Sequence, residues 1–390
     1  MKTNRRNMLK LFGTAAVAAG LAPLVSPSEA AGRKHMFDQV DIGGLTLKNR
    51  IVRAPTSMEM ADEDGNPTSA VLKVYEEVAK GGSALVITGV AYVYKPDQHR
   101  KESLGLHDDS QIPAFRELAD VIRRNGALSS LQIGFGGSMS GYKTDEREIW
   151  GPSAVEHPWT KITPKEMTKE DIQTVVETMA AAARRTKEAG FDSVELHFCH
   201  SFLINQFLNP FFNRRTDEYG GSIENRCRLP FDVTEAVRKA VGPDYPVLAK
   251  IMGQDYSDPG QTLKEGIYLT EGLAKRGLTA VEISGGQPVR PDVHEDATLQ
   301  GYFEKDAVAL GKSLDIPLIL TGGNRTVKAM EAALNAEGDI AAMGLSRAIL
   351  SEPDLPNRLR KDPSYDPQCI ACNECIANYG QQPTVCVLNV

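Results

Sequence analysis

Short runs of β-branched and other apolar residues alternate with longer amphipathic stretches from about residue 45 to residue 362. The short runs are typical of strands buried in a parallel sheet, and the amphipathic stretches predict helices that pack back onto that sheet. The pattern predicts eight strands, at 51–54, 84–88, 129–133, 193–196, 247–251, 280–283, 317–320 and 340–343. Eight strand–helix units close into a barrel, so the expected fold is α/β, a (β/α)8 TIM barrel.

One stretch shows the helical pattern with particular clarity, because it carries start and stop signals at its ends. Thr168 is a suitable N-cap with Asp171 in the first turn, and Gly190 supplies the stop before the next strand. The apolar face between these ends consists of Ile172, Val175, Val176, Met179, Ala180 and Ala183. Because a strand follows directly, this helix is expected to pack against the sheet.

The composition is that of an ordinary globular protein, with 390 residues, 41% of them hydrophobic and 24% charged, and a mean hydropathy of −0.29. These values exclude disorder and fibres. The net charge is −7 and no long run of Lys and Arg follows the first residues, which argues against a nucleic acid partner. Without an interdomain linker, the chain divides into an expected leader at 1–31, a barrel at 32–362 and a cysteine-rich appendage at 363–390.

The amino-terminal segment has the layout of an export signal. Arg5 and Arg6 precede an Ala/Gly-rich apolar run at 11–25, and small residues follow, so removal is expected near Ala30 or Ala31. The run is shorter than the about 20 residues that span a bilayer. The paired arginines resemble a twin-arginine signal, which predicts a periplasmic or otherwise extracytoplasmic protein that the twin-arginine translocase exports folded, with its cofactor inserted. The alternatives are a basic cytoplasmic N-terminus and an uncleaved anchor.

Four of the six cysteines, Cys369, Cys372, Cys375 and Cys386, lie in one short carboxyl-terminal stretch. Four thiolates are the number that holds a four-iron cluster. They also suit a tetrahedral zinc site, and in an oxidising compartment they could pair as disulfides or remain free. The spacing therefore predicts a metal site and leaves its content open.

Several segments form specific motifs beyond the general strand–helix pattern. They are LKNRIV at 47–52 with APT at 54–56, FDSVELH at 191–197 leading to NRRTDEYGGS at 213–222, TGGN at 321–324, and MG at 343–344 with Arg347 and EPDL at 352–355. These motifs resemble the Old Yellow Enzyme family over about residues 37–386. The cysteine-rich tail is similar to the branch that contains trimethylamine dehydrogenase and 2,4-dienoyl-CoA reductase, which implies a 4Fe-4S cluster beside a flavin.

The resemblance also implies a bound FMN at the carboxyl ends of the strands, where barrels place their chemistry. Gln132 can pair with the pyrimidine edge of the flavin, Lys250 stands where most relatives have an arginine near flavin N1, and Arg347 can neutralise the phosphate. The full set expected to bind FMN is Pro55, Thr56, Ser57, Gly89, Gln132, Lys250, Gly322, Gly323, Asn324, Ser346 and Arg347. Taken singly, such residues are also consistent with a turn, a buried amide and a surface ion pair.

His197 and His200 follow the fourth predicted strand and are expected to be catalytic. In relatives such a pair donates hydrogen bonds to a carbonyl or other anionic oxygen of the substrate, which makes the β-carbon of an activated alkene electrophilic towards hydride. The alternatives are a metal-binding pair and structural histidines. Many relatives have a proton-donating tyrosine where this chain has Phe202, so the proton is expected from solvent or from another tyrosine: Tyr92, Tyr94 or Tyr142.

Together these features predict an exported FMN-dependent oxidoreductase that reduces the activated C=C bond of a small unsaturated carbonyl or carboxylate compound. A 4Fe-4S cluster passes single electrons and would relay them to the flavin. The chain has no Gly-rich dinucleotide fingerprint, so the expected electron donor is a redox partner such as a cytochrome or a quinol-linked carrier. The alternatives are an amine (C–N) dehydrogenase of the same fold and a non-catalytic extracytoplasmic flavoprotein that binds a ligand or carries electrons.

Overall fold

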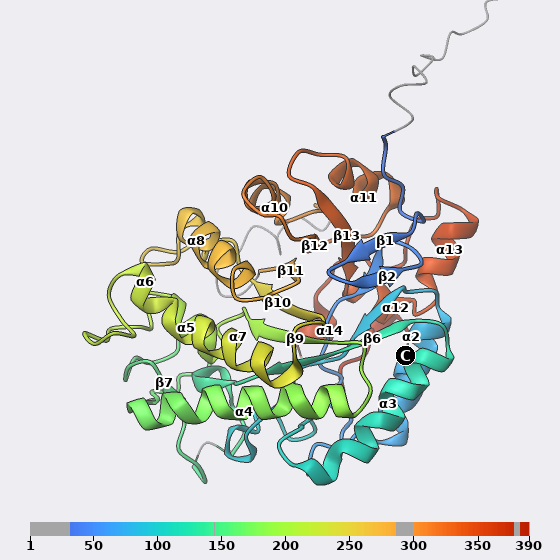
Figure 1. Cartoon of the computed structure of the whole chain (residues 1–390). Coiled ribbons are helices and arrows are strands. Elements are labelled where there is room, and N and C mark those ends of the chain that lie inside the picture. Colours follow the sequence, from blue (N-terminus) through green and yellow to red (C-terminus); the bar gives the residue numbers. More distant parts are fainter. Residues whose placement is uncertain (1–31, 144, 286–298, 378–382, 390) are drawn as a thin grey trace, which may run out of the picture. The chain divides into compact units, whose positions relative to one another are not determined.

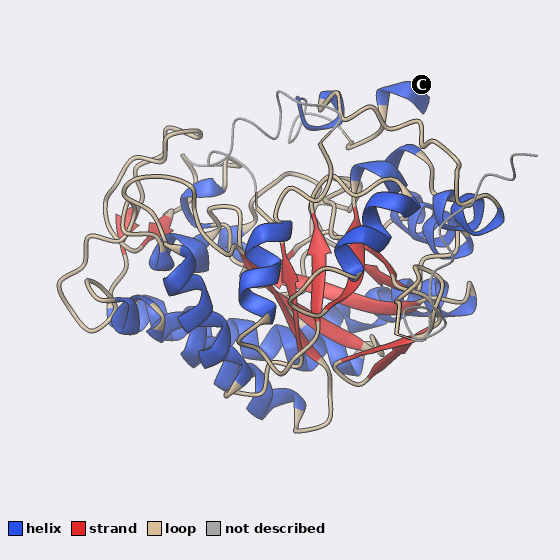
Figure 2. Cartoon of the chain, turned by 90° about the horizontal axis from the view of Figure 1, so that it is seen from above, coloured by secondary structure: helices blue, strands red, loops and turns tan. Residues whose placement is uncertain are grey.

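A closed ring of parallel strands lies at the centre of residues 34–390, which form one compact unit (Figures 1 and 2). The computed structural model describes residues 32–143, 145–285, 299–377 and 383–389, so the expected leader at 1–31 lies outside the described residues. In chain order the ring strands are β3 (Ile51–Arg53), β4 (Leu85–Ile87), β6 (Leu128–Gly134), β9 (Ser193–Phe198), β10 (Val247–Ile251), β11 (Ala280–Ile283), β12 (Leu318–Thr321) and β13 (Ile340–Leu345). Each pairs in parallel with the next, and β13 pairs with β3 to close the ring.

Every predicted strand is present, and each of its ends lies within two residues of the predicted position. The hydrophobic pattern succeeds because the ring strands are buried on both faces, by helices outside and by side chains inside, and therefore appear as continuous apolar runs. The predicted (β/α)8 barrel is confirmed.

Helices cover the outside of the ring (Figure 2). The longer ones are α2 (Ser69–Lys80), α3 (Ile112–Arg124), α4 (Lys169–Glu188), α7 (Arg228–Val241), α8 (Leu263–Ala274), α10 (Glu304–Gly311), α11 (Val327–Leu334) and α13 (Leu355–Lys361). The shorter ones are α5 (Leu203–Leu208), α6 (Ile223–Arg226), α12 (Arg347–Ser351) and α14 (Glu374–Ala377), with 3-10 turns η1 (Lys95–Asp97), η2 (Asp109–Gln111), η3 (Gly137–Met139) and η4 (Val387–Asn389). Within the described ranges, no helix combines the length and the apolar character needed to cross a membrane.

Helix α4 begins and ends as its sequence signals predict. Thr168 caps it through a reciprocal pair of hydrogen bonds: the Asp171 N–H donates to Thr168 Oγ1 at 3.1 Å, and the Thr168 N–H donates to Asp171 Oδ2 at 2.9 Å. Gly190, with a φ of +87°, follows its end. The apolar face is buried except for Ala180, which is partly exposed.

An antiparallel hairpin closes the amino end of the ring. Its strands β1 (Val40–Ile42) and β2 (Leu45–Leu47) pack Ile42 and Leu47 against residues near the starts of ring strands, among them Leu248 and Ile319. The remaining strands are short: β5 (Ala91–Tyr92) extends the sheet beside β6, and β7 (Trp150–Gly151) pairs with β8 (Lys165–Glu166). The carboxyl ends of the ring strands are consequently the end of the barrel at which a site can form.

Candidate active site

A cavity of about 600 Å³ lies at the carboxyl ends of the ring strands. It brings together segments from opposite ends of the chain, since Thr56 Oγ1 and Ser346 Oγ lie 2.9 Å apart across 290 positions of sequence. Both predicted catalytic residues, His197 and His200, line it. The predicted FMN-binding residues that line it are Pro55, Thr56, Ser57, Gln132, Lys250, Gly322, Gly323, Asn324, Ser346 and Arg347.

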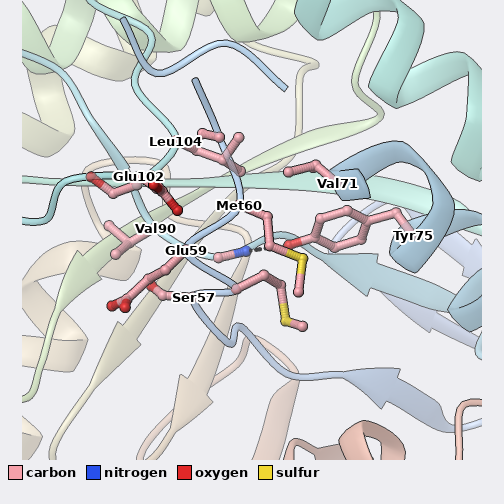
Figure 3. Close-up of a pocket in the computed structure, with 12 residues that line it drawn as sticks. Ser57, Glu59, Met60, Val71, Tyr75, Val90, Glu102 and Leu104 are labelled. Carbon is pink, nitrogen blue, oxygen red and sulfur yellow. Dashed lines mark hydrogen bonds between the residues drawn. The ribbon is translucent and has the colours of Figure 1, made fainter. Parts of the chain in front are cut away.

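Gly89 is the predicted FMN-binding residue that lies outside the lining of this cavity. It borders a much smaller cavity of about 10 Å³, together with Ser57, Tyr75 and Val90 (Figure 3), and its N–H donates to the Tyr75 hydroxyl at 2.7 Å. A Cβ at residue 89 would lie 2.7 Å from the carbonyl oxygen of Thr56. Glycine here allows the segment after β3 to pack closely against the end of β4, and its contact with FMN stays a prediction.

The turn after β12 has a backbone that only glycine tolerates easily. Gly323 has a φ of +71°, and a Cβ there would lie 2.5 Å from the ring of Tyr302. Asn324 holds the turn in place, because its side-chain N–H groups donate to the carbonyls of Leu320 at 2.7 Å and Gly344 at 3.1 Å. The side chain of Asn324 thus joins β12 to β13, and the turn exposes backbone to the cavity.

Two guanidinium groups lie at this end of the cavity. Arg347 donates to the Tyr302 hydroxyl at 3.2 Å and also to the Asn373 side-chain oxygen, which engages only part of its five N–H donors. Arg325 also lines the cavity, and its buried Nη1 has no hydrogen-bond partner among the residues that the structure describes. Arg325 was not among the residues predicted to bind FMN, although a cation directly after a Gly-Gly-Asn turn indicates a phosphate site. The glycine turn, the unpaired donor and the cavity volume together fit the phosphate and ring of FMN.

Lys250, which was predicted as the cation near flavin N1, has a counter-ion inside the barrel. Its ammonium lies 2.9 Å from Glu282 Oε1, and both side chains are buried. Beside them, Gln132 Nε2 donates to Glu195 Oε2 at 2.7 Å. Burial raises the pKa of Glu195 well above its usual value, and the neighbouring Glu282 raises it further. Burial alone would lower the pKa of Lys250, but Glu282 and Glu195 outweigh that effect and raise it, so the lysine stays charged.

Glu195 and Glu282 were not predicted as site residues from the sequence. Each is a single acidic residue inside an apolar strand run, Val194-Glu195-Leu196 and Val281-Glu282-Ile283. Such a residue must point into the barrel to meet a partner, and that placement was the available signal.

The two histidines lie next to each other, with ring centroids 5.2 Å apart. His200 and the following Ser201 both have φ values near +60°, and this pair of left-handed residues turns the chain sharply after β9. Burial lowers the pKa of His197 well below its usual value and that of His200 to about 3, so both imidazoles are neutral at neutral pH. His200 Nε2 lies 3.3 Å from Ser284 Oγ, while the buried His197 Nδ1 has no hydrogen-bond partner within the described ranges.

Phe202 lines the cavity beside the histidines, with its ring edge-on to His197 at a centroid distance of 4.4 Å. The tyrosines that were expected as substitute proton donors, Tyr92, Tyr94 and Tyr142, are not among the residues that line the cavity. Tyr92 donates instead to the Asp64 carbonyl at 2.8 Å. Tyr302 does line the cavity, but at the end near Arg347.

The cysteine-rich segment forms part of the same cavity, because Cys369, Cys372 and Cys375 line it. Cys386 does not line it, but it acts electrostatically on Cys375, as the other two do, and burial raises the pKa of the Cys375 thiol to about 11. All six cysteines of the chain are free thiols. Within the described part of the chain, no three His, Cys, Asp or Glu side chains are arranged to hold a metal ion. Whether the cysteine segment holds an iron–sulfur cluster or zinc, and whether the histidine pair binds a metal, stay predictions.

A sequence model of the NADH:flavin oxidoreductase / NADH oxidase family matches residues 35–365. The chain belongs to this family. The family likeness expected from the motifs is therefore confirmed, and the match supports FMN as the group that the cavity holds.

Individual relatives agree with the family match. The metal reductase of Desulforamulus reducens is 31% identical over 370 residues, which are 91% of this chain and 53% of the relative. An NADPH dehydrogenase of Geobacillus thermodenitrificans is 34% identical over 334 residues, 84% of this chain and 94% of the relative. A solved complex of 2-naphthoyl-CoA reductase with 2-naphthoyl-CoA superposes with a TM-score of 0.83 at 27% identity, over 90% of this chain and 56% of that one. The chain thus spans about half the length of several proteins that it resembles.

Proposed function

We propose that this chain is an FMN-dependent oxidoreductase that reduces a C=C bond conjugated to a carbonyl or carboxylate group of a small molecule. The observation that carries the proposal is a pair of adjacent histidines, the buried His197 and the half-buried His200, in the same cavity as the glycine turn and Arg347. The relatives are named as reductases and NADPH dehydrogenases, which supports a reductive flavin reaction.

The histidine pair polarises the substrate in this proposal. Each neutral imidazole carries one N–H, and two such donors can bind one carbonyl oxygen and stabilise the negative charge that develops on it. Because the site is buried, these hydrogen bonds are stronger than in water. Bound FMN supplies the hydride. Phe202 carries no exchangeable proton, so the proton for the α-carbon comes from solvent at the open side of the cavity.

We further propose that Cys369, Cys372, Cys375 and Cys386 hold a 4Fe-4S cluster. The support is that all four thiols are free and that the other three act electrostatically on Cys375. Four thiolates are the number that holds a four-iron cluster. The hydrogen bond from Arg347 to Asn373 ties this segment to the FMN end of the cavity.

The electron donor follows from the cluster and from the expected export. Twin-arginine export through residues 1–31 would place the protein in the periplasm or another extracytoplasmic compartment, where a cytochrome or quinol-linked carrier could deliver single electrons through the cluster. The relatives named NADPH dehydrogenase favour NADPH instead. Comparing the rate of flavin reduction by NADPH with that by a reduced cytochrome decides between these donors.

An anaerobic flavin titration tests the reaction. Chemically reduced holoprotein is mixed with a series of enones and unsaturated acids, and the flavin absorbance is followed; reoxidation by these compounds is the expected result. If amines instead bleach the oxidised flavin, the protein is an amine dehydrogenase. If neither class of compound changes the spectrum, it is the non-catalytic flavoprotein of the third alternative.

The variants His197→Ala and His200→Ala complete the test. Removing one donor to a developing oxyanion typically slows turnover by about 100- to 1,000-fold. Flavin content should remain near that of the wild type, because the glycine turn and the arginines are untouched. Unchanged reoxidation rates in both variants would contradict the assignment of the pair.

A further inference from the structure

Two buried carboxyl groups share one cation inside the barrel. Glu195 on β9 and Glu282 on β11 flank Lys250 on β10, and Glu282 lies directly opposite Lys250 in the strand register. Both glutamates are completely buried, and Lys250 is 2% exposed. The three residues therefore form a compact triad that solvent does not screen.

Each of the two carboxyl groups uses only one oxygen in hydrogen bonds or ion pairs with other residues. Glu282 Oε1 accepts from Thr321 Oγ1 at 2.5 Å and pairs with the Lys250 ammonium, while Glu195 Oε2 accepts from Gln132. Glu195 Oε1 and Glu282 Oε2 are buried, and among the described residues neither accepts from a hydrogen-bond donor. A hydrogen-bonding contact with the Glu282 carboxyl is one of the causes that raise the pKa of Glu195. Such a contact is favourable only if one of them carries a proton, because two carboxylates repel.

The charges around the triad also indicate that one of the two carboxyl groups is protonated. The titratable groups that act on Lys250 from neighbouring elements are the two glutamates and the thiol of Cys199, whose pKa burial raises well above its usual value. His197 and His200, which also face Lys250, are neutral. One ammonium balances one carboxylate, and a second carboxylate would be a buried charge without a partner, which is costly.

We propose that Glu195 and Glu282 share a single proton, so that the triad with Lys250 is neutral and Glu195 is a positioning residue for Gln132. Because Glu195 takes one N–H of the Gln132 amide, the amide presents its remaining polar atoms to the cavity in a fixed orientation. The triad also presents less positive charge to the flavin than a bare lysine would. This inference extends the proposed FMN function, but the shared proton does not depend on which substrate is reduced.

Infrared spectroscopy of the holoprotein in D₂O tests the proton directly. At about pH 9, Asp97 and Asp255, whose pKa values burial raises to about 7 and about 6, are ionised and do not contribute. We expect the carbonyl stretch of a protonated carboxylic acid in the wild type and its loss in Glu195→Gln. It should also be lost in Glu282→Gln, because Glu195 then ionises beside Lys250.

The matched control is Glu352→Gln, which changes another buried carboxylate. Glu352 accepts from Tyr365 and Gln368 and pairs with Arg358, away from the triad. This variant should keep the band. A wild-type spectrum without the band overturns the proposal even if no variant folds, and so does a band that persists in both Glu195→Gln and Glu282→Gln.

The midpoint potential of bound flavin is a second readout, which a merely structural role would not move. Glu195→Gln exchanges a neutral acid for a neutral amide, so the potential should equal that of the wild type. The double variant Glu195→Gln/Glu282→Gln leaves Lys250 without a counter-charge, and its potential should rise, because a cation favours the reduced flavin. A rise in Glu195→Gln as large as in the double variant would show that Glu195 is ionised. Failure of the proposed reaction would change neither measurement.

Discussion

The glycine turn after β12 allows a quantitative test of the FMN site through Gly323→Ala. A Cβ at residue 323 would lie 2.5 Å and 2.6 Å from two atoms of the Tyr302 ring, in a residue with a φ of +71°. The left-handed conformation costs an alanine about 1–2 kcal/mol, and overpacking costs a further 1–3 kcal/mol or so. The free protein can relieve this strain by moving the turn, and FMN binding must then restore it. At about 1.4 kcal/mol per factor of ten, the affinity for FMN should fall by roughly 30- to 3,000-fold.

The assay is a titration of apoprotein with FMN, followed by the quenching of flavin fluorescence. Gly141→Ala is the matched control, because nothing lies within 4 Å of a Cβ there and its φ is not positive. Adding Tyr302→Ala to Gly323→Ala should recover the overpacking part of the loss but not the backbone part. If Gly323→Ala binds FMN as tightly as the wild type, the turn does not form the phosphate site.

Three further predictions concern the substrate, the fold and the cysteines. Phe202→Tyr places a hydroxyl beside His197 and should raise turnover if protonation limits it; stopped-flow reoxidation in H₂O and D₂O measures this, and an unchanged rate and isotope effect would place the limit elsewhere. Burial raises the pKa of Asp97 to about 7, above its unfolded value, so the wild type should lose stability as pH rises from about 4 through 7; Asp97→Asn should lack this slope in melting temperatures, and equal slopes in the two proteins would exclude Asp97 as its source. Cys369→Ser should lower the iron content of anaerobically purified protein while FMN content persists, and wild-type iron in the variant would exclude Cys369 as a ligand.

The sequence predicts the barrel well because its strands are buried on both faces and its site residues follow directly after them. His197 and the Gly322-Gly323 turn could be placed on this basis, since the carboxyl ends of parallel strands meet at one rim. Lys250 was predicted as a site residue, but its counter-ion Glu282 was not. Pairing between neighbouring strands depends on their register, which a single sequence does not reveal. Gly89 follows a strand as predicted, but it packs closely against the backbone of Thr56 and lies outside the lining of the large cavity.

The hairpin β1–β2 affects the order in which the electron donor and the substrate can bind. Because Ile42 and Leu47 pack against residues near the starts of the ring strands, reactants approach the site from the carboxyl ends of the strands. Two reactants that occupy the same cavity exclude each other. A small electron donor that binds in the cavity must therefore depart before the oxidising substrate arrives, which predicts ping-pong kinetics with mutual competitive inhibition at high concentration. A partner that passes electrons through the cysteine segment instead would leave the cavity free for the substrate, so that the substrate could bind without waiting for the donor to leave.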